Sequence, residues 1–375
     1  MNRMRQLSLA LMVSAAVSLI MTGMTGCKGD PGPQGPPGPG ADVFEGFADG
    51  IQCATCHNPD VDTTYYIAGR AYQWAQSKHA KGGDSERNGS SCAGCHTTEG
   101  FIQRMNGDPV TSQYVPSPPG CFACHSPHSR GDFSLRKATP VTIGSNISGI
   151  PDAVFDYGKG NLCVQCHQTR SMSPKMPANP GSTDTIRITS SRWYSHYGVQ
   201  GQMLSGNGGY KFPGYAYTGN SNHTSNTAII QEGCPTCHMA EQSYPPAQGT
   251  GKAGGHTMNI HYEAEGGEEV PLLTGCLQSG CHPSSFSAND MHLVQGGIAD
   301  SLTALRSALV ARGWIDPSTN LVNASSSSPL VITPAVKAGA LYNYFFIEHD
   351  LSEGIHNTNY ARELLASSLE ALRNP

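Results

Sequence analysis

Two cysteines followed directly by a histidine recur through this chain of 375 residues. The pattern C-x-x-C-H occurs five times, and a stretched form, C-x-x-x-x-C-H, occurs once. C-x-x-C-H is the attachment site of a c-type haem: two thiols bond covalently to the cofactor, and the histidine that follows coordinates its iron. The sequence therefore predicts six haem c groups. The attachment cysteines would be Cys53, Cys56, Cys92, Cys95, Cys121, Cys124, Cys163, Cys166, Cys234, Cys237, Cys276 and Cys281.

Each motif supplies one axial iron ligand. These six ligands are His57, His96, His125, His167, His238 and His282. Of the 15 histidines in the chain, the remaining ones outnumber the six further ligands that six-coordinate irons would need. Histidine on both faces keeps the iron at a low potential, which suits electron transfer, whereas a methionine ligand would raise that potential. With histidine in surplus, we expect bis-histidine ligation.

Zinc is the alternative use of paired cysteines. Two C-x-x-C units build a zinc ribbon, but zinc has no use for a histidine directly after every second cysteine. The thirteenth cysteine of the chain, Cys27, lies outside the motifs, so no cysteines remain for a disulfide framework. The motif pattern therefore favours haem.

Composition predicts an irregular chain. Hydrophobic residues make up 38 % and charged residues 14 %, with 44 Gly and 26 Pro. We expect a multihaem cytochrome c fold that is mostly coil, with a few α-helices wrapping a haem core, a helical C-terminal third and little β-structure. The porphyrins would supply most of the apolar bulk. The formal charge of −5 gives no basic excess, so nucleic acid is not an expected partner.

The sequence of the N-terminus indicates an export signal followed by a lipid anchor. Residues 1–26 have basic residues, then an apolar run and then small residues, which is typical of a secretory signal. The segment ending at Cys27 resembles a bacterial lipobox, in which that cysteine is lipidated. Residues 27–48 would form the anchor and a Gly/Pro spacer with four collagen-like triplets, either an extended linker or a trimerisation tag. Residues 49–375 would form a hexahaem domain, exported as an outer-membrane lipoprotein.

Helical periodicity is confined mainly to the end of the chain. We expect helices over 70–80, 299–312, 334–349 and 358–373. The third would have Thr333 as its N-cap and Pro334 at its first helical position. The last carries an apolar stripe made of Tyr360, Leu364, Leu365, Leu369 and Leu372. Regions rich in Gly, Ser, Asn and Pro are expected to be loops, namely 81–91, 106–120, 171–190, 199–226 and 325–328.

Several short segments resemble those of bacterial multihaem cytochromes. Residues 74–80 match the pattern W-x-x-S-x-H-A, and residues 124–128 match C-H-x-P-H. Residues 196–200 match H-x-G-x-Q, and the segment 354–360 is similar to a histidine segment before a closing helix. That superfamily includes outer-membrane proteins of metal-respiring bacteria and octahaem oxidoreductases. The stretched motif is similar to one in tetrahaem cytochromes of sulfate reducers.

The resemblance implies which histidines complete the irons. The implied distal ligands are His79, His128, His196, His223, His256 and His356. His128 would ligate a haem other than that of its own motif. His261 remains an alternative to His256, and His292 and His349 are expected to be surface residues or neighbours of the ligands.

The expected function is an electron conduit that passes electrons across the periplasm or outer membrane. Its partners would be redox proteins, the membrane through the lipid anchor, and an extracellular metal or mineral acceptor. The alternative is a reductase of nitrite, hydroxylamine or tetrathionate with one open iron. Pentahaem nitrite reductases mark that iron with C-x-x-C-K, and no motif here ends in lysine. A second alternative is a subunit of a cytochrome filament.

Overall fold

The structure is a computed structural model that describes residues 48–373, apart from 59, 61, 83, 84, 220, 242–250 and 279. These residues belong to one unit, Glu45–Pro375. The expected signal, the lipidation site Cys27 and the collagen-like triplets lie outside the described residues. The structure therefore bears on the expected hexahaem domain.

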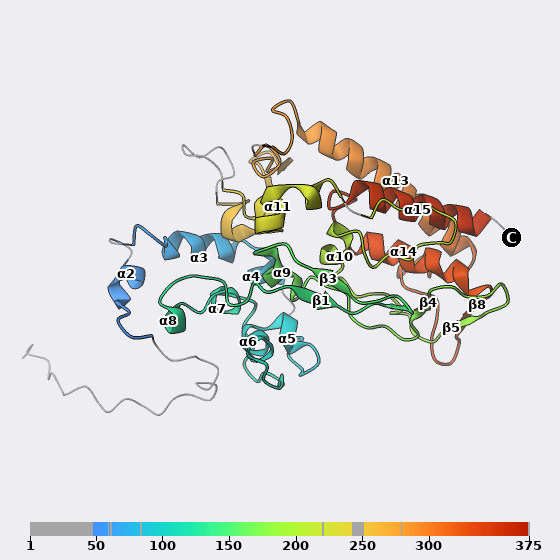
Figure 1. Ribbon diagram of the computed structural model, residues 1–375, viewed down its shortest axis with the longest axis horizontal. Coiled ribbons are helices and arrows are strands. Elements are labelled where there is room, and N and C mark those ends of the chain that lie inside the picture. The colour runs from blue at the N-terminus through green and yellow to red at the C-terminus, as the bar shows by residue number, and fades with distance from the viewer. Residues whose placement is uncertain are drawn as a thin grey trace, which may run out of the picture. The chain divides into compact units, whose positions relative to one another are not determined.

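Short helices joined by coil make up the chain up to the fifth motif (Figure 1). The many glycines and prolines favour turns over long helices. The helix after the second motif shows how such a helix is bounded: the Thr97 hydroxyl accepts from Gly100 N at its start, and Gly107 ends it in a left-handed conformation. The helices are α2 (Cys53–His57), α3 (Ile67–Ala75), α4 (Lys78–Gly82), α5 (Ala93–His96), α6 (Thr98–Asn106), α7 (Cys121–Cys124), α8 (Pro127–Arg130), α9 (Gly160–Val164), α10 (Gln200–Leu204), α11 (Thr227–Glu232) and α12 (Pro235–His238), with 3-10 turns η2 (His223–Ser225) and η3 (Gly255–Thr257).

Strands are short and form two-stranded sheets. Three sheets are antiparallel (β1–β3, β5–β8 and β6–β7), and β2–β4 is parallel. The β5–β8 pair, in register at Ile186 and Ile332, joins the middle of the chain to its C-terminal third. The strands are β1 (Val141–Ile143), β2 (Ile147–Ser148), β3 (Ala153–Phe155), β4 (Met176–Pro177), β5 (Ile186–Ile188), β6 (His261–Glu263), β7 (Glu269–Pro271) and β8 (Leu330–Ile332).

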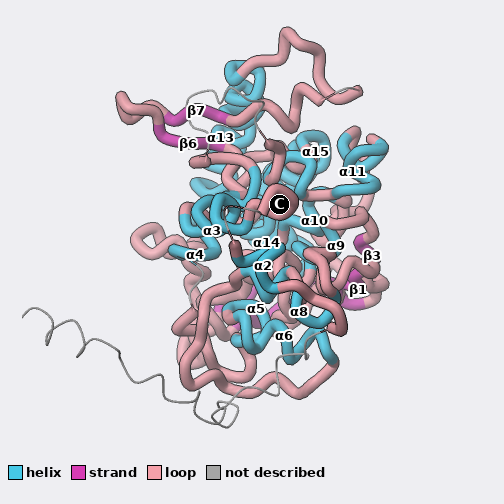
Figure 2. The backbone as a smooth tube through the Cα atoms, turned by 90° about the vertical axis from the view of Figure 1, so that its left-hand side faces the viewer, coloured by secondary structure: helices cyan, strands magenta, loops and turns pink. Residues whose placement is uncertain are grey.

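Three longer helices lie together in the C-terminal third: α13 (Ala288–Ala311), α14 (Ala338–Glu348) and α15 (Thr358–Arg373). Every residue of α14 from Ala338 to Ile347 is buried. The expected stripe of α15 faces inward, because Tyr360, Leu364, Leu365 and Leu372 are buried and Leu369 is partly buried. The fold class is therefore as the sequence predicted: coil with helices, a helical end and little sheet (Figure 2).

Several expected boundaries are wrong for local reasons. The helix expected over 70–80 is split into α3 and α4, because the Ser77 hydroxyl accepts from Ala80 N and starts a second helix. Helix α13 begins at Ala288 and not at residue 299, because Ser287 and Asp290 form a capping box there. Pro334 has an extended backbone and precedes a 3-10 turn, η4 (Ala335–Lys337), so Thr333 is not the N-cap.

Two of the expected loops also contain regular structure. The region 171–190 includes β4 and β5, and the region 199–226 includes α10 and η2. Residues 325–328 are a loop, as expected. Strands of two or three residues carry too little alternation to be recognised from sequence, because their pairing partners lie far along the chain.

The apolar core lies mainly in the C-terminal third. Helices α13, α14 and α15 pack there with Ile186 and Ile188 of β5 and with Trp193, which is fully buried. Around the motifs the apolar clusters are small, and one consists of Phe101, Ala123 and Leu162. The protein's own apolar core is therefore thin around the motifs, where porphyrins are expected to supply the apolar bulk, and it is substantial at the C-terminal end. Among the described residues, no helix combines the length and apolar character needed to cross a lipid bilayer.

Candidate haem sites

Each C-x-x-C-H motif lies on or beside one turn of helix. Helices α2, α5, α7, α9 and α12 overlap the first five motifs. With 3.6 residues per turn, cysteines three apart lie on the same side of a helix, as two bonds to one cofactor require. The backbone N–H of the motif histidine then donates to the carbonyl of the first cysteine, for example from His96 to Cys92 at 3.2 Å and from His125 to Cys121 at 2.8 Å. The motif is therefore one closed turn.

The stretched motif closes in the same way without a helix. The N–H of His282 donates to the carbonyl of Cys276 at 2.9 Å. The corresponding distance is 3.0 Å between His238 and Cys234 in the fifth motif. The motif histidine therefore keeps the same backbone bond to the first cysteine despite the two extra residues.

The structure places each motif histidine beside a second histidine ring. We number the sites 1 to 6 in the order of their motifs along the chain. The distances between ring centres are 6.1 Å for His57–His128 at site 1, 6.3 Å for His96–His196 at site 2, 6.4 Å for His125–His256 at site 3, 6.1 Å for His167–His79 at site 4, 6.2 Å for His238–His356 at site 5 and 6.2 Å for His282–His223 at site 6.

This spacing fits one iron between two rings. A metal lies about 2 Å from the nitrogen of a histidine ligand, and the ring centre lies about 1 Å behind that nitrogen. Two imidazoles on opposite faces of one iron therefore have centres about 6 Å apart. The six partner rings belong to the six histidines that the resemblance implied, and each is now assigned to a site.

The partner histidines come from different kinds of backbone. His79 lies in α4, His128 in α8 and His256 in η3. His196 lies in a loop and has a positive φ of 69°, a conformation uncommon for residues other than glycine. Its neighbours fix that loop, because Trp193 and Ser195 are buried and the Ser195 hydroxyl donates to Tyr342 Oη at 3.0 Å.

Hydrogen bonds at Nδ1 orient several of these rings. His238 Nδ1 donates to the Met258 carbonyl at 3.0 Å, and His223 Nδ1 donates to the His356 carbonyl at 3.4 Å. Because a carbonyl oxygen only accepts, Nδ1 carries the proton and Nε2 keeps its lone pair for a metal. His167 Nδ1 lies 3.1 Å from Gln200 Oε1, which orients that ring in the same way.

Burial keeps several of the rings neutral. Desolvation lowers the pKa of His79, His196, His238 and His256 to about 4 in each case, with smaller contributions from neighbouring positive groups. These imidazoles are therefore unprotonated near neutral pH. Metal ligands need that protonation state.

Site 5 has a different environment. Burial by itself would lower the pKa of His356, but the Asp350 carboxylate outweighs it and raises that pKa. The two groups are bonded directly, with His356 Nδ1 2.7 Å from Asp350 Oδ1. Asp350 is 2 % exposed and also accepts from the Ser352 hydroxyl. A carboxylate behind a ligand imidazole makes the ring a stronger electron donor.

Side chains and backbone link neighbouring sites. Arg104 Nη1 lies 3.1 Å from Cys95 Sγ, and its Nη2 donates to the Gln165 carbonyl at 2.6 Å, which joins the motifs of sites 2 and 4. The motifs of sites 4 and 5 also touch, because the side chains of Cys163 and Cys234 are within hydrogen-bonding reach of each other. Met258 contacts both sites, with its sulfur 3.0 Å from His79 Nδ1 and its carbonyl bonded to His238.

Site 6 is linked to site 5, site 3 is linked to site 4, and site 1 is linked to site 3. His223 of site 6 bonds the backbone of His356 of site 5. Cys124 of site 3 and Cys166 of site 4 pack against the same apolar cluster. Site 1 is connected to site 3 through the segment that carries both His125 and His128.

Three histidines have no ring partner among the motif histidines. His261 is exposed and lies 3.8 Å from Glu269, and His292 is exposed on α13. His349 is buried, with its Nε2 3.0 Å from Glu348 Oε2. His256, and not His261, lies beside a motif histidine.

Sequence reasoning missed the residues that orient the ligands. Gln200 belongs to the H-x-G-x-Q segment, so its glutamine was a signal that could have been used. Nothing in the local sequence marks Met258 or Asp350, because each meets its partner only through the fold.

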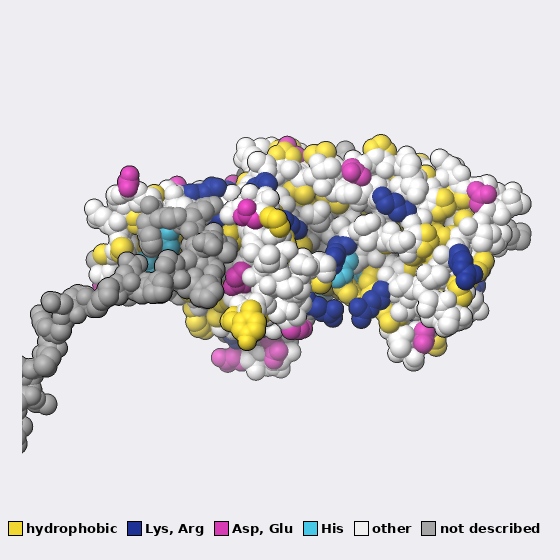
Figure 3. Space-filling view, turned by 90° about the horizontal axis from the view of Figure 1, so that it is seen from below, with side chains coloured by type: hydrophobic (Ala, Val, Ile, Leu, Met, Phe, Trp, Pro, Cys, Tyr) yellow, Lys and Arg dark blue, Asp and Glu magenta, His cyan; other side chains and the backbone are white. Residues whose placement is uncertain are grey.

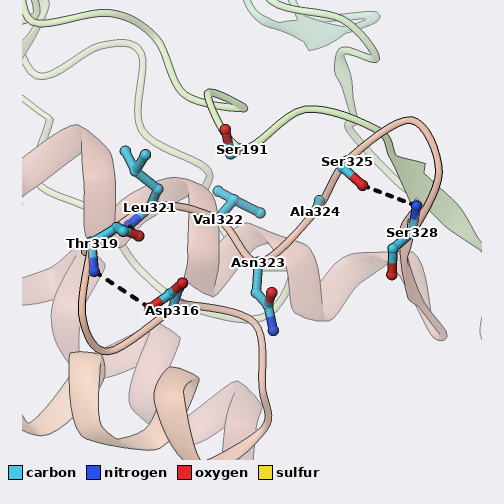
Figure 4. Close-up of a pocket in the computed structure, with 9 residues that line it drawn as sticks. All are labelled: Ser191, Asp316, Thr319, Leu321, Val322, Asn323, Ala324, Ser325 and Ser328. Carbon is cyan, nitrogen blue, oxygen red and sulfur yellow. Dashed lines mark hydrogen bonds between the residues drawn. The ribbon is translucent and has the colours of Figure 1, made fainter.

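A cavity of about 310 Å³ lies elsewhere in the fold (Figure 4). Ser191 and the loop from Asp316 to Ser328 line it, and none of its lining residues is a motif cysteine or a paired histidine. The cavity is therefore separate from the six sites.

The motifs, the fold and the paired rings resemble those of multihaem c-type cytochromes, whose cofactor is haem c. It is similar to the C-type polyheme cytochrome OmcB of Geobacter sulfurreducens, at 26 % identity over 169 residues in both strain DL-1/KN400 and strain PCA. That match covers 39 % of this chain and 22 % of the relative, so the chain spans about a fifth of that protein.

The fold is also similar to a solved structure, that of the outer cell wall cytochrome OcwA. The TM-score is 0.50 at 18 % identity, over 81 % of this chain and 50 % of that one. No family model matches the chain.

Proposed function

We propose that this chain is an electron carrier with six covalently bound haems, each held between two histidines. The observation that carries the proposal is the set of ring pairs, in which each motif histidine has a second imidazole about 6 Å away. When bound, each haem supplies a one-electron Fe(III)/Fe(II) couple. The protein supplies covalent attachment, two ligands per iron and the hydrogen bonds that orient them.

The ring pairs favour a conduit over a reductase. A reductase needs one iron face open to substrate, and among the described residues each motif histidine has a partner ring that would close that face. With both faces closed, substrate would not bind the iron directly. Electrons then enter and leave through the cofactor edges.

The contacts between sites support a branched series. Sites 1, 3, 4, 5 and 6 follow one another, and site 2 joins at site 4 through Arg104. Site 4 is then the junction, because its cysteines Cys163 and Cys166 lie near cysteines of sites 2, 3 and 5. Such a series has three ends, at sites 1, 2 and 6, where partners would exchange electrons.

We also propose that the protein is exported and anchored through a lipid on Cys27, with redox proteins and an extracellular metal or mineral as its partners. The sequence of residues 1–40 supports export and a spacer. The similarity to a cytochrome described as an outer cell wall protein agrees with a location outside the cytoplasm.

Haem counting by intact mass tests the number six. The purified protein should carry six haems, and Cys276→Ser/Cys281→Ser, which removes both thiols of site 6, should reduce the count. Leu277→Ser, which changes the same motif but none of its cysteines or its histidine, should leave six. An unchanged count in Cys276→Ser/Cys281→Ser would show that the stretched motif does not attach a haem.

A further inference from the structure

Two arginines lie close enough to the histidine pair of site 2 to act on His196, and a third, Arg192, lies on the loop that carries His196. Arg170 Nη2 donates to the carbonyl of Ser91 at 3.1 Å, and Ser91 directly precedes the motif. Arg87 and Arg170 both act electrostatically on the His196 ring. Arg192 lies on the loop that carries His196 and acts on Tyr194. All three arginines are exposed.

This basic group contrasts with the whole chain, whose formal charge is −5. The nearby acidic group Glu348 is engaged with His349, its carboxylate lying 3.0 Å from His349 Nε2. Glu86, beside Arg87, is exposed and offsets part of the charge. Figure 3 shows a face of the molecule on which Lys and Arg side chains gather around a histidine.

Arginine suits anions with several oxygen or nitrogen atoms, because its planar guanidinium offers several donors. A positive group on a negative protein also directs anions to one place and raises their association rate. Tyr197, next to His196, is 52 % exposed, so the surface beside this pair is open to solvent.

We propose that site 2 is where the chain exchanges electrons with a small, multiply charged anion that docks on Arg87, Arg170 and Arg192. This inference rests on the proposed function and adds a substrate class to one end of the branched series. One electron leaves the reduced protein and the docked acceptor gains it, so the acceptor becomes more negative by one charge. No bond forms or breaks and no proton moves.

Two outer-sphere oxidants of opposite charge test the proposal, ferricyanide as the anion and hexaammineruthenium(III) as the cation. The rate of oxidation of the reduced protein is measured for Arg87→Gln/Arg170→Gln, with Arg170→Lys to retain charge. Arg362→Gln on α15 is the matched control, because it removes an exposed arginine from another part of the fold. Binding of redox-inactive hexacyanocobaltate(III) is measured by calorimetry as a readout independent of electron transfer.

The double variant should lose roughly tenfold in the rate with ferricyanide at low ionic strength, and the loss should shrink as salt is added. Its rate with the cation should stay the same or rise, and its binding of hexacyanocobaltate(III) should weaken. Arg170→Lys should retain most of the anion rate, and Arg362→Gln should resemble the unmodified protein.

Two results would overturn the proposal. The first is an unchanged ferricyanide rate in the double variant. The second is an equal slowing of both oxidants with a shifted midpoint potential, which would mean that the arginines neutralise carboxylates of the cofactor. Both results leave the haem count and the spin state untouched, so they are distinguishable from failure of the proposed function.

Discussion

At the scale of single residues, the sites differ in the group that lies within hydrogen-bond distance of Nδ1 of a paired histidine. Backbone carbonyls accept from His238 and His223, an amide oxygen lies beside His167, and a buried carboxylate bonds His356. The acceptor behind a ligand tunes the metal, because a negative acceptor stabilises the more positive oxidation state. We therefore expect site 5 to have a lower potential than its ligand set alone would give it.

Replacing Asp350 tests this tuning. Asp350→Asn keeps the shape but removes the charge behind His356. One midpoint potential should rise by roughly 50–100 mV, since a hydrogen bond to a charged group contributes about 1–2 kcal/mol to a one-electron couple. Potentiometric titration followed by absorbance measures the shift. Asp300→Asn, an exposed carboxylate on α13, should leave all potentials unchanged, and an unchanged titration in Asp350→Asn would contradict the tuning.

The histidines that form the ring pairs could be picked out from the sequence, but which of them pair could not. A motif places its own histidine by local geometry, and short segments marked the other six. Which ring lies beside which motif depends on the fold. Two other motifs separate His79 from the motif of site 4 in the sequence, and one other motif separates His356 from the motif of site 5. No local pattern carries that information.

At the scale of elements, different parts of the fold have different roles. Single helical turns and loops carry the attachment motifs and the second ligands, whereas α13, α14 and α15 form the apolar core. The stripe on α15 was readable because it repeats with helical period over a whole helix. The start of α13 at Ala288 depends on one capping box, and the short strands depend on partners far along the chain. Neither feature could therefore be predicted from the sequence.

Truncating a core leucine tests the role of the C-terminal helices. Leu364 is fully buried on α15, so Leu364→Ala should lower the free energy of unfolding of this region by about 3 kcal/mol. Denaturant titration followed by circular dichroism measures the change. Leu293→Ala, at a position 75 % exposed on α13, should cost far less. Equal effects of the two substitutions would mean that the helices do not form the stabilising core.

At the scale of the whole molecule, the proposed series of sites extends through the part of the chain that has little apolar core. Packing there is thin in the protein itself, and covalent cofactors would supply the missing contacts. The chain covers about a fifth of one cytochrome to which its sequence is similar and half of another to which its fold is similar. The three ends of the branched series would allow a donor, an acceptor and a neighbouring cytochrome to bind at different places.

The spin state of the irons in the oxidised protein tests the central claim most directly. Electron paramagnetic resonance should show only low-spin iron, in two classes, because three ring pairs are inclined by 34–39° and three by 71–75°. Adding nitrite or hydroxylamine should change nothing. His79→Ala should convert one iron to high spin, and His292→Ala, which removes an exposed histidine, should convert none. A high-spin signal in the unmodified protein that shifts with nitrite would contradict the account and indicate an open, catalytic iron.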